Sequence, residues 1–131
     1  MLVKDGTLFA QIDGEYDGNC GGVAMWYYST SNHFFWSFED AGENTVLIKN
    51  KLGTYMSVDP SNINGDGASI KTWSKLVGRN QKWEIKYVGD NKYVIKQAAG
   101  DKAIVRSNGN IILGSADTDA AKWTIEQKKQ A

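Results

Sequence analysis

Short segments in which apolar and polar residues alternate run along the whole chain, and glycine-rich turns separate them. The 131 residues include 14 glycines and one proline, and many of the glycines stand in Asn-Gly, Asp-Gly and Gly-Gly pairs. Such pairs favour the tight turns of β-hairpins. Amphipathic helical periodicity is absent from every window longer than about ten residues. The pattern therefore predicts an all-β protein.

One pattern of strands recurs three times. Residues 2–4, 47–49 and 94–96 read Leu-Val-Lys, Leu-Ile-Lys and Val-Ile-Lys, at intervals of 45 and 47 residues. Each copy is followed by a glycine, a second apolar strand, a turn-rich loop, a third strand and a closing strand. Units of about four short strands cannot bury an apolar face alone, so the three must share one core. We expect a single domain over residues 1–131, with units of approximately 1–45, 46–92 and 93–131.

The closing strands carry a motif. The second unit reads Asn80-Gln81-Lys82-Trp83, and the matching segments of the other units are Phe34-Phe35-Trp36 and Ala121-Lys122-Trp123. Together with the strand Ile70–Trp73, the motif resembles the Gln-x-Trp repeat of ricin B-type lectins. The resemblance covers nearly the whole chain. It implies a β-trefoil of three pseudo-equivalent four-stranded units and a carbohydrate-binding function without enzymatic activity.

The five tryptophans fall into two groups, because residues two apart share a face of a strand. In each closing strand the tryptophan shares its face with another apolar residue. The pairs are Trp36 with Phe38, Trp83 with Ile85, and Trp123 with Ile125. Apolar pairs at the same place in each unit predict a shared core.

The other two tryptophans are predicted to face solvent. Trp73 shares its face with Lys71, whereas Ile70 and Thr72 lie on the opposite face. Lysine is rarely buried, so the face with Trp73 is expected to meet water. Trp26 has a similar place in the first unit. An exposed indole can stack on the C–H face of a pyranose while nearby polar groups bind its hydroxyls.

The resemblance to the lectins also implies a set of binding residues. In that family a site combines an Asp on the second strand, an aromatic residue on the third, and an Asn just before the Gln-x-Trp. The second unit has Trp73 and Asn80 at the last two places, with Gln81 as a polar or structural neighbour. Ser57 stands where the Asp aligns, and Asp59 is the nearest acid on the same face.

The same comparison gives the first unit a second candidate site and the third unit none. In the first unit the candidates are Asp13 or Gln11, Trp26, and Asn32 or His33. In the third unit Arg106, Leu113 and Ala120 take the three places, and none of them can stack on or clasp a sugar. The resemblance implies galactose or N-acetylgalactosamine termini, and the absent Asp leaves this sugar class open.

Charge and cysteine content limit the classes of partner that we expect for this protein. Lys plus Arg and Asp plus Glu both number 15, so the net charge is zero, whereas nucleic-acid binders carry a concentrated basic excess. Cys20 is the lone cysteine, and the sequence contains neither a signal-peptide pattern nor an apolar run of about 18 residues. We therefore expect no nucleic-acid partner, no membrane insertion and no cofactor or metal, and a cytoplasmic or non-classically secreted protein. Shallow sugar sites are weak, so pairing into a homodimer would add avidity.

Other kinds of site are disfavoured. His33 is the only histidine, and Cys20 lies in a glycine-rich turn without the context of a catalytic cysteine. Glu39, Asp40 and Glu43 follow one another closely enough to indicate a solvated turn rather than two carboxylates facing each other across a substrate. Residues 62–67 begin like a calcium loop, but its twelfth position is Trp73 instead of an acid. The rival hypothesis is a protein-binding trefoil, such as a protease inhibitor or a cytoskeletal ligand, that uses the loop 59–67.

Overall fold

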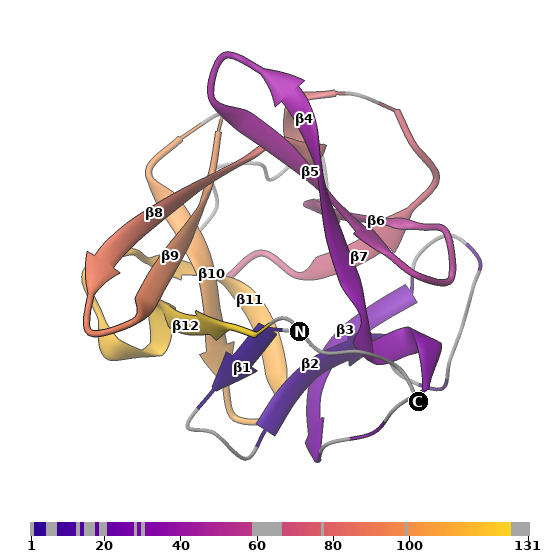
Figure 1. The fold of residues 1–131 in the computed structure, drawn as a ribbon, viewed down its shortest axis with the longest axis horizontal. Helices are drawn as coiled ribbons and strands as arrows, with labels where there is room; N and C mark the ends of the chain where they lie inside the picture. Colours follow the sequence, from indigo (N-terminus) through magenta and orange to yellow (C-terminus); the bar gives the residue numbers. More distant parts are fainter. Residues whose placement is uncertain are drawn as a thin grey trace.

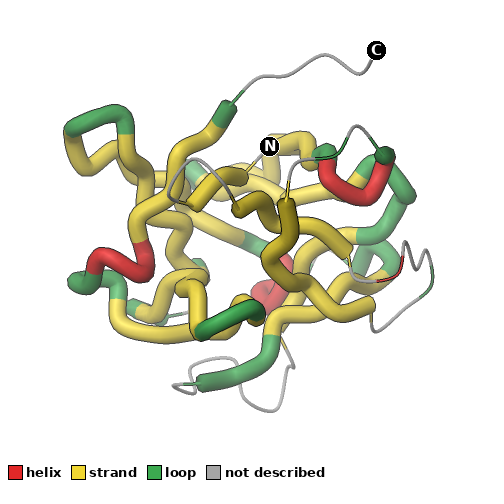
Figure 2. The backbone as a smooth tube through the Cα atoms, turned by 90° about the horizontal axis from the view of Figure 1, so that it is seen from below, coloured by secondary structure: helices red, strands yellow, loops and turns green. Residues whose placement is uncertain are grey.

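The computed structural model describes residues 2–4, 8–12, 14, 18, 21–27, 29, 31–58, 67–76, 78–98 and 100–126. In these residues the chain forms twelve strands joined by turns and short 3-10 helices (Figures 1 and 2). The strands are β1 (Leu2–Lys4), β2 (Leu8–Ile12), β3 (Gly21–Tyr27), β4 (Trp36–Gly42), β5 (Thr45–Asn50), β6 (Tyr55–Val58), β7 (Ile70–Trp73), β8 (Trp83–Gly89), β9 (Lys92–Gln97), β10 (Lys102–Ser107), β11 (Asn110–Ser115) and β12 (Lys122–Ile125). The helices are η2 (Asn32–Phe34), η4 (Arg79–Gln81) and η5 (Asp119–Ala121), one before each closing strand. The all-β prediction is confirmed.

All strand pairs are antiparallel and belong to one continuous, barrel-like sheet (Figure 1). The sheet is closed by pairs between strands that are distant in sequence. β1 pairs with β12, where Leu2 lies opposite Ile125, and β5 pairs with β8, where Val46 lies opposite Trp83. The hairpins β4–β5 and β8–β9 each contain a bulge just before the turn. The turn residues Glu43, Asn44, Asp90 and Asn91 have positive φ, as tight hairpin turns require.

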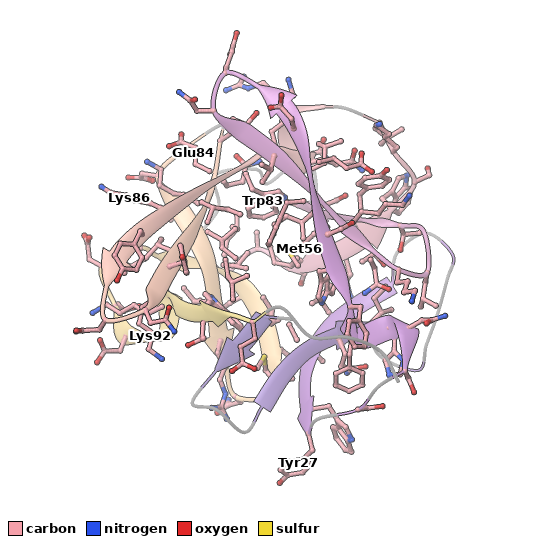
Figure 3. All side chains as sticks on the ribbon, in the orientation of Figure 1. Tyr27, Met56, Trp83, Glu84, Lys86 and Lys92 are labelled. Atoms are coloured by element: carbon pink, nitrogen blue, oxygen red, sulfur yellow. The ribbon has the colours of Figure 1, made fainter. Side chains whose placement is uncertain are left out.

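The closing tryptophans repeat one hydrogen bond three times. The indole Nε1 of Trp36 donates to the carbonyl oxygen of Ala10 at 3.1 Å, that of Trp83 to Met56 at 3.2 Å, and that of Trp123 to Ile104 at 3.0 Å. Each bond satisfies a carbonyl group on the second strand of a unit. Figure 3 shows Trp83 and Met56 near the middle of the molecule. Ala10, Met56 and Ile104 therefore hold equivalent places, and they align the three units residue by residue.

The core contains the three closing tryptophans but not every apolar residue that was predicted to pack with them. Trp83 and Trp123 are fully buried, and Trp36 is partly buried against the same cluster. The prediction that Phe38 belongs to the core is wrong, because its side chain is 38% exposed. Ile48, directly opposite Phe38 across the β4–β5 hairpin, is fully buried and holds that core position instead. The closing strand runs outward into the hairpin, so its third residue already lies at the edge of the core.

Candidate functional site

The outer face of β6 and β7 carries the predicted site of the second unit. Trp73 lies directly opposite Tyr55, and Lys71 lies directly opposite Ser57. Lys71 is exposed and Trp73 is half-buried, whereas Ile70 and Thr72 point into the core. The alternation predicted from sequence is confirmed for this strand. We call Tyr55, Ser57, Lys71 and Trp73 the outer face of unit two.

Gln81 organises the loop behind this face. Its side chain is fully buried. Its Oε1 accepts a hydrogen bond from the backbone N–H of Leu76 at 2.8 Å. Its Nε2 donates to the carbonyl oxygen of Ser74 at 2.8 Å and to the Ser57 hydroxyl at 3.1 Å. Of the two roles that the sequence left open for Gln81, the geometry matches the structural one, because a buried side chain with three partners does not reach a ligand.

Asn80 closes the same loop from the other side. It is half-buried in η4, and its Nδ2 donates to the carbonyl oxygen of Val58 at 3.0 Å. This bond ties η4 to the end of β6, next to the outer face of unit two. The neighbouring candidate Asp59 lies outside the described residues. The structure therefore places Lys71 and Trp73 on one face of β7 and ties Asn80 to the end of the adjacent strand β6, and the position of Asp59 rests on sequence alone.

Sequence reasoning missed an acidic group at this face. The hydroxyl of Tyr55 donates to both carboxylate oxygens of Glu39, at 3.2 and 3.0 Å. The ammonium of Lys75 lies 3.4 Å from Oε1 of Glu39, and it also lies 5.9 Å from the centre of the Tyr55 ring. The sequence grouped Glu39 with the acids of the following turn, but the turn itself is formed by Glu43 and Asn44. Glu39 points instead to the neighbouring unit.

The contacts of Glu39 shift two pKa values. The hydrogen bond from Tyr55 is the main cause that holds the pKa of Glu39 below its ordinary value, and the charges of Lys75 and Lys49 act in the same direction against partial desolvation. Burial raises the pKa of the Tyr55 hydroxyl, and the hydrogen bond and charge of Glu39 raise it further. The carboxylate is therefore kept ionised and the phenol protonated, which is the pairing in which one donates and the other accepts.

In the first unit the register gives Trp26 the place of Trp73. Ala10 lies opposite Met25, as Met56 lies opposite Thr72, and Trp26 follows Met25 directly. The Trp26 side chain is 61% exposed. Its ring lies 6.0 Å from that of Tyr27, in an edge-to-face arrangement at the rim of the molecule (Figure 3). A solvent-facing indole therefore stands at the same place in both units.

The polar candidates of the first unit are less favourably placed. His33 holds the place of Asn80 in η2, but it is buried, and its ring contacts that of Phe34 at 4.6 Å. Asn32 is exposed one residue earlier. Gln11 is 4% exposed, and Asp13 lies outside the described residues. The first unit thus keeps the aromatic residue and replaces the amide with a buried imidazole.

The third unit needs a correction of register. Ile104 lies opposite Leu113, so Leu113 matches Thr72 and is fully buried, and Gly114 takes the place of Trp73. Likewise Val105, not Arg106, takes the place of Ser57. Counting residues back from the closing tryptophan gave the wrong alignment, because Gly114 precedes Trp123 by nine residues, whereas Trp73 precedes Trp83 by ten. A slip of one residue moves a side chain to the opposite face.

The corrected register strengthens the contrast between the units. The outer face of the third unit is an apolar cluster of Val94, Ala103, Val105 and Ala121, with Ile112, Ala116 and Ala120 packed against it. Ala120 and Ala121 stand where Asn80 and Gln81 stand in the second unit. Beside this cluster lies a cleft of about 390 Å³ whose lining includes Lys86, Lys96 and Lys102. This face has no aromatic ring or amide at the positions that define the outer face of unit two.

The described residues offer little for other kinds of chemistry. They contain no group of three or more His, Cys, Asp and Glu side chains that could hold a metal ion. None of the described helices is long and apolar enough to cross a membrane. Cys20 and residues 59–66 lie outside the described part of the chain. Of the segment 62–67 that begins like a calcium loop, and of the loop 59–67 proposed for protein binding, the structure therefore describes Gly67 alone.

A protein-family comparison agrees with the fold. Residues 32–117, about two thirds of the chain, match the model of the ricin-type β-trefoil lectin domain-like family. The chain belongs to this family. No curated protein matches this lectin-like domain in sequence.

Solved structures show the same β-trefoil fold. The designed threefold-symmetric protein ThreeFoil superposes with a TM-score of 0.87 at 22% identity, over 94% of both chains. The Polyporus squamosus lectin gives 0.80 at 19% identity, over 94% of this chain and 46% of that one, so the domain spans under half of its length. The Rhizoctonia solani agglutinin gives 0.75 at 18% identity, over 91% and 85% of the two chains.

Proposed function

We propose that this lectin-like domain is a carbohydrate-binding protein without enzymatic activity, and that it binds glycans at shallow sites on units one and two. The observation that carries the proposal is the outer face of unit two. There the half-buried Trp73 stands beside a loop that the buried Gln81 holds in place with three hydrogen bonds. A rigid aromatic surface with fixed polar neighbours loses little conformational entropy when a ligand binds.

The expected contacts follow from the chemistry of a pyranose ring. Trp73 stacks on the apolar C–H face of the sugar, while the exposed Lys71 and the half-buried Asn80 offer donors and acceptors to its hydroxyls. Asp59 is proposed as a further acceptor. In unit one Trp26 takes the stacking role, with Asp13, Asn32 and His33 as its polar candidates. We infer that the three four-stranded units are pseudo-equivalent and that the third has lost the site.

The sugar class is proposed to be galactose or N-acetylgalactosamine termini. This rests on the resemblance of Trp73, Asn80 and Gln81 to the lectin pattern. One structural neighbour, the Polyporus squamosus lectin, was solved with the epitope Neu5Aca2-6Galb1-4GlcNAc, which contains galactose. Single shallow sites bind weakly, so we propose that strength comes from two sites per chain or from a homodimer. A cytoplasmic or non-classically secreted location is proposed with it.

The deciding experiment is a glycan array probed with labelled wild-type protein and with Trp73→Ala and Trp26→Ala. We expect wild type to bind galactose-terminated or N-acetylgalactosamine-terminated glycans, each single variant to retain part of the signal, and the double variant to lose it. The matched control is Tyr87→Ala, which removes an aromatic side chain that is 59% exposed on the β8–β9 hairpin, away from both sites. A wild type that binds no glycan would refute the proposal and favour the protein-binding alternative.

A further inference from the structure

We propose that Glu39 supplies the carboxylate of the unit-two site, at a place where the lectin pattern would have an Asp on the second strand and this chain has Ser57. The group it would bind is a pair of neighbouring hydroxyls on a pyranose stacked on Trp73. The inference rests on the proposed function and names a residue that belongs to the preceding unit of the chain.

The first step is the position of the carboxylate. Tyr55 and Trp73 are directly opposite residues on one face of an antiparallel pair, and the Cβ atoms of such residues lie about 4.5 to 5.5 Å apart. The Tyr55 hydroxyl holds both oxygens of Glu39 at 3.2 and 3.0 Å. The carboxylate is thereby fixed beside Tyr55, the residue directly opposite the stacking Trp73.

The second step is the capacity of the carboxylate to bind a ligand. An ionised carboxylate has about four acceptor sites. One donor comes from Tyr55 and another from Lys75, and the side chain of Glu39 is still 34% exposed. Acceptor sites on the solvent side are thus open to hydroxyl donors. Ser57 offers no such site, since it is 5% exposed, accepts from Gln81 and donates to the carbonyl oxygen of Tyr55.

The third step is a comparison of the three units by register. For each unit, strand pairing places three residues side by side. One belongs to the preceding closing strand, one to the first strand and one to the second strand. The three sets are Ser37, Lys49 and Tyr55; Thr124, Val3 and Phe9; and Glu84, Lys96 and Ala103. Two residues beyond the first member of each set stand Glu39, Glu126 and Lys86.

This comparison separates the units in the same way as the aromatic residues do. Glu39 contacts Tyr55, which lies opposite Trp73, and by the same residue count Glu126, just after β12, corresponds to it for the unit with Trp26. Lys86, labelled in Figure 3, holds it for the third unit, where Gly114 replaces the tryptophan. Lys86 also lines the cleft beside the apolar cluster of that unit. An acid therefore occurs at this position in the two units that keep the indole and is replaced by a base in the unit that lacks it. A role in a shared site accounts for this pattern.

The test uses the Trp26→Ala background, so that unit one does not mask unit two. Into it we introduce Glu39→Gln, which keeps an oxygen to accept from Tyr55, and, as a matched control, Asp40→Asn, which changes the adjacent exposed acid. Binding is measured on galactose-terminated and N-acetylgalactosamine-terminated glycans of the array. We expect Glu39→Gln to lose at least tenfold in affinity, and Asp40→Asn to match its parent. Melting temperatures establish that both variants are folded.

A pH series adds a result that a merely structural role would not give. The charged or titratable groups around Glu39 are Tyr55 from β6, Lys49 from β5 and Lys75 after β7. Glu39 is the carboxylic acid of this group, and the pKa of the Tyr55 hydroxyl is raised, so a change of affinity under acidic conditions is assigned to Glu39. We expect affinity at unit two to fall as the pH drops below the ordinary pKa of a glutamate, and to fall by less over the same range in Glu39→Gln, where the proposed acceptor Asp59 is still present.

The outcomes are distinguishable. If Trp73→Ala abolishes binding in this background while Glu39→Gln binds as its parent does, the role of Glu39 is refuted and the lectin function stands. The same conclusion follows if the affinity of Glu39→Gln keeps the pH dependence of its parent. If wild type binds no glycan at all, the proposed function fails and the inference fails with it.

Discussion

Tyr55 and Trp73 lie directly opposite each other on β6 and β7, with side chains on the same face of the sheet. Their environments differ. Tyr55 is 5% exposed and is fixed by Glu39, whereas Trp73 remains half-buried. The pair thus consists of a supporting ring and a ring that is open to a ligand. Because the two rings have different roles, we predict substitutions that change glycan binding and substitutions that change stability separately.

Trp73→Ala should remove binding at unit two and leave most of the stability, because its ring is only half-buried. Trp83→Ala removes a fully buried indole and its hydrogen bond to Met56. Large aromatic-to-alanine changes in cores cost about 3 to 5 kcal/mol, out of a typical total of about 5 to 15 kcal/mol. Denaturant unfolding and a binding isotherm of each variant measure the two effects. Equal losses of stability would contradict the assignment of Trp73 to the surface.

Gln81→Leu should weaken both folding and binding. The leucine keeps the volume but removes the hydrogen bonds to Leu76 and Ser74 and the buried one to the Ser57 hydroxyl, and a buried polar group that loses its partner costs about 1 to 3 kcal/mol. The loop beside Trp73 also loses its support, so affinity at unit two should fall. Arg79→Ala, an exposed change in the same helical turn, is the control. A Gln81→Leu variant with the unfolding midpoint of wild type would show that the loop does not depend on this side chain.

Stability should depend on pH through Glu39 and Tyr55. The folded-state pKa of Glu39 is lowered, so its stabilising contribution is present above the unfolded-state pKa and is lost as the pH falls through the folded-state value. The pKa of Tyr55 is raised, so its contribution is present below the unfolded-state pKa and is lost as the pH rises through the folded-state value. Melting curves from acidic to alkaline pH, compared between wild type and Glu39→Gln, measure both limbs. We expect the variant to lose part of the dependence at each end, and identical curves would contradict the coupling.

Gly114→Ala should destabilise the domain although it adds one methyl group. A Cβ at this position would lie 2.7 Å from Cγ2 of Val105, and overpacking of this kind costs about 1 to 3 kcal/mol. Gly109→Ala is the matched control, since a Cβ there has nothing within 4 Å. Val105→Ala should relieve part of the effect in a double variant. If Gly114→Ala unfolds at the same denaturant concentration as wild type, Val105 can move aside, and the third unit could accept a larger side chain.

The faces of strands were predictable from sequence because alternation is a local property. Ile70 to Trp73 alternates between core and surface as expected, and the three closing tryptophans lie in or against the core. Register was harder to predict. The third unit has one residue fewer between its aromatic position and its closing tryptophan, so equal counting selected Leu113 in place of Gly114.

Contacts between units could not be predicted by comparing the sequences of the units one with another. Glu39 lies in the first unit by sequence, but its hydroxyl donor Tyr55 and its cation Lys75 lie in the second. Nothing local to residues 39–43 distinguishes an acid that crosses to a neighbouring unit from acids on a solvated turn. The signal was the position of Glu39 three residues after a closing tryptophan, and it has meaning only once the strands have been paired.

The pairing of β1 with β12 has a consequence for how the domain is made. Leu2 and Val3 find their partners at Ile125 and Thr124, near the far end of the described chain. During synthesis the first strand is therefore exposed along one edge until nearly the whole domain has emerged from the ribosome. Pairings between such distant segments form slowly, and unpaired edges are prone to aggregation. Truncations that remove β12 should consequently leave a nascent chain with an open edge, which makes this fold dependent on completing its last strand.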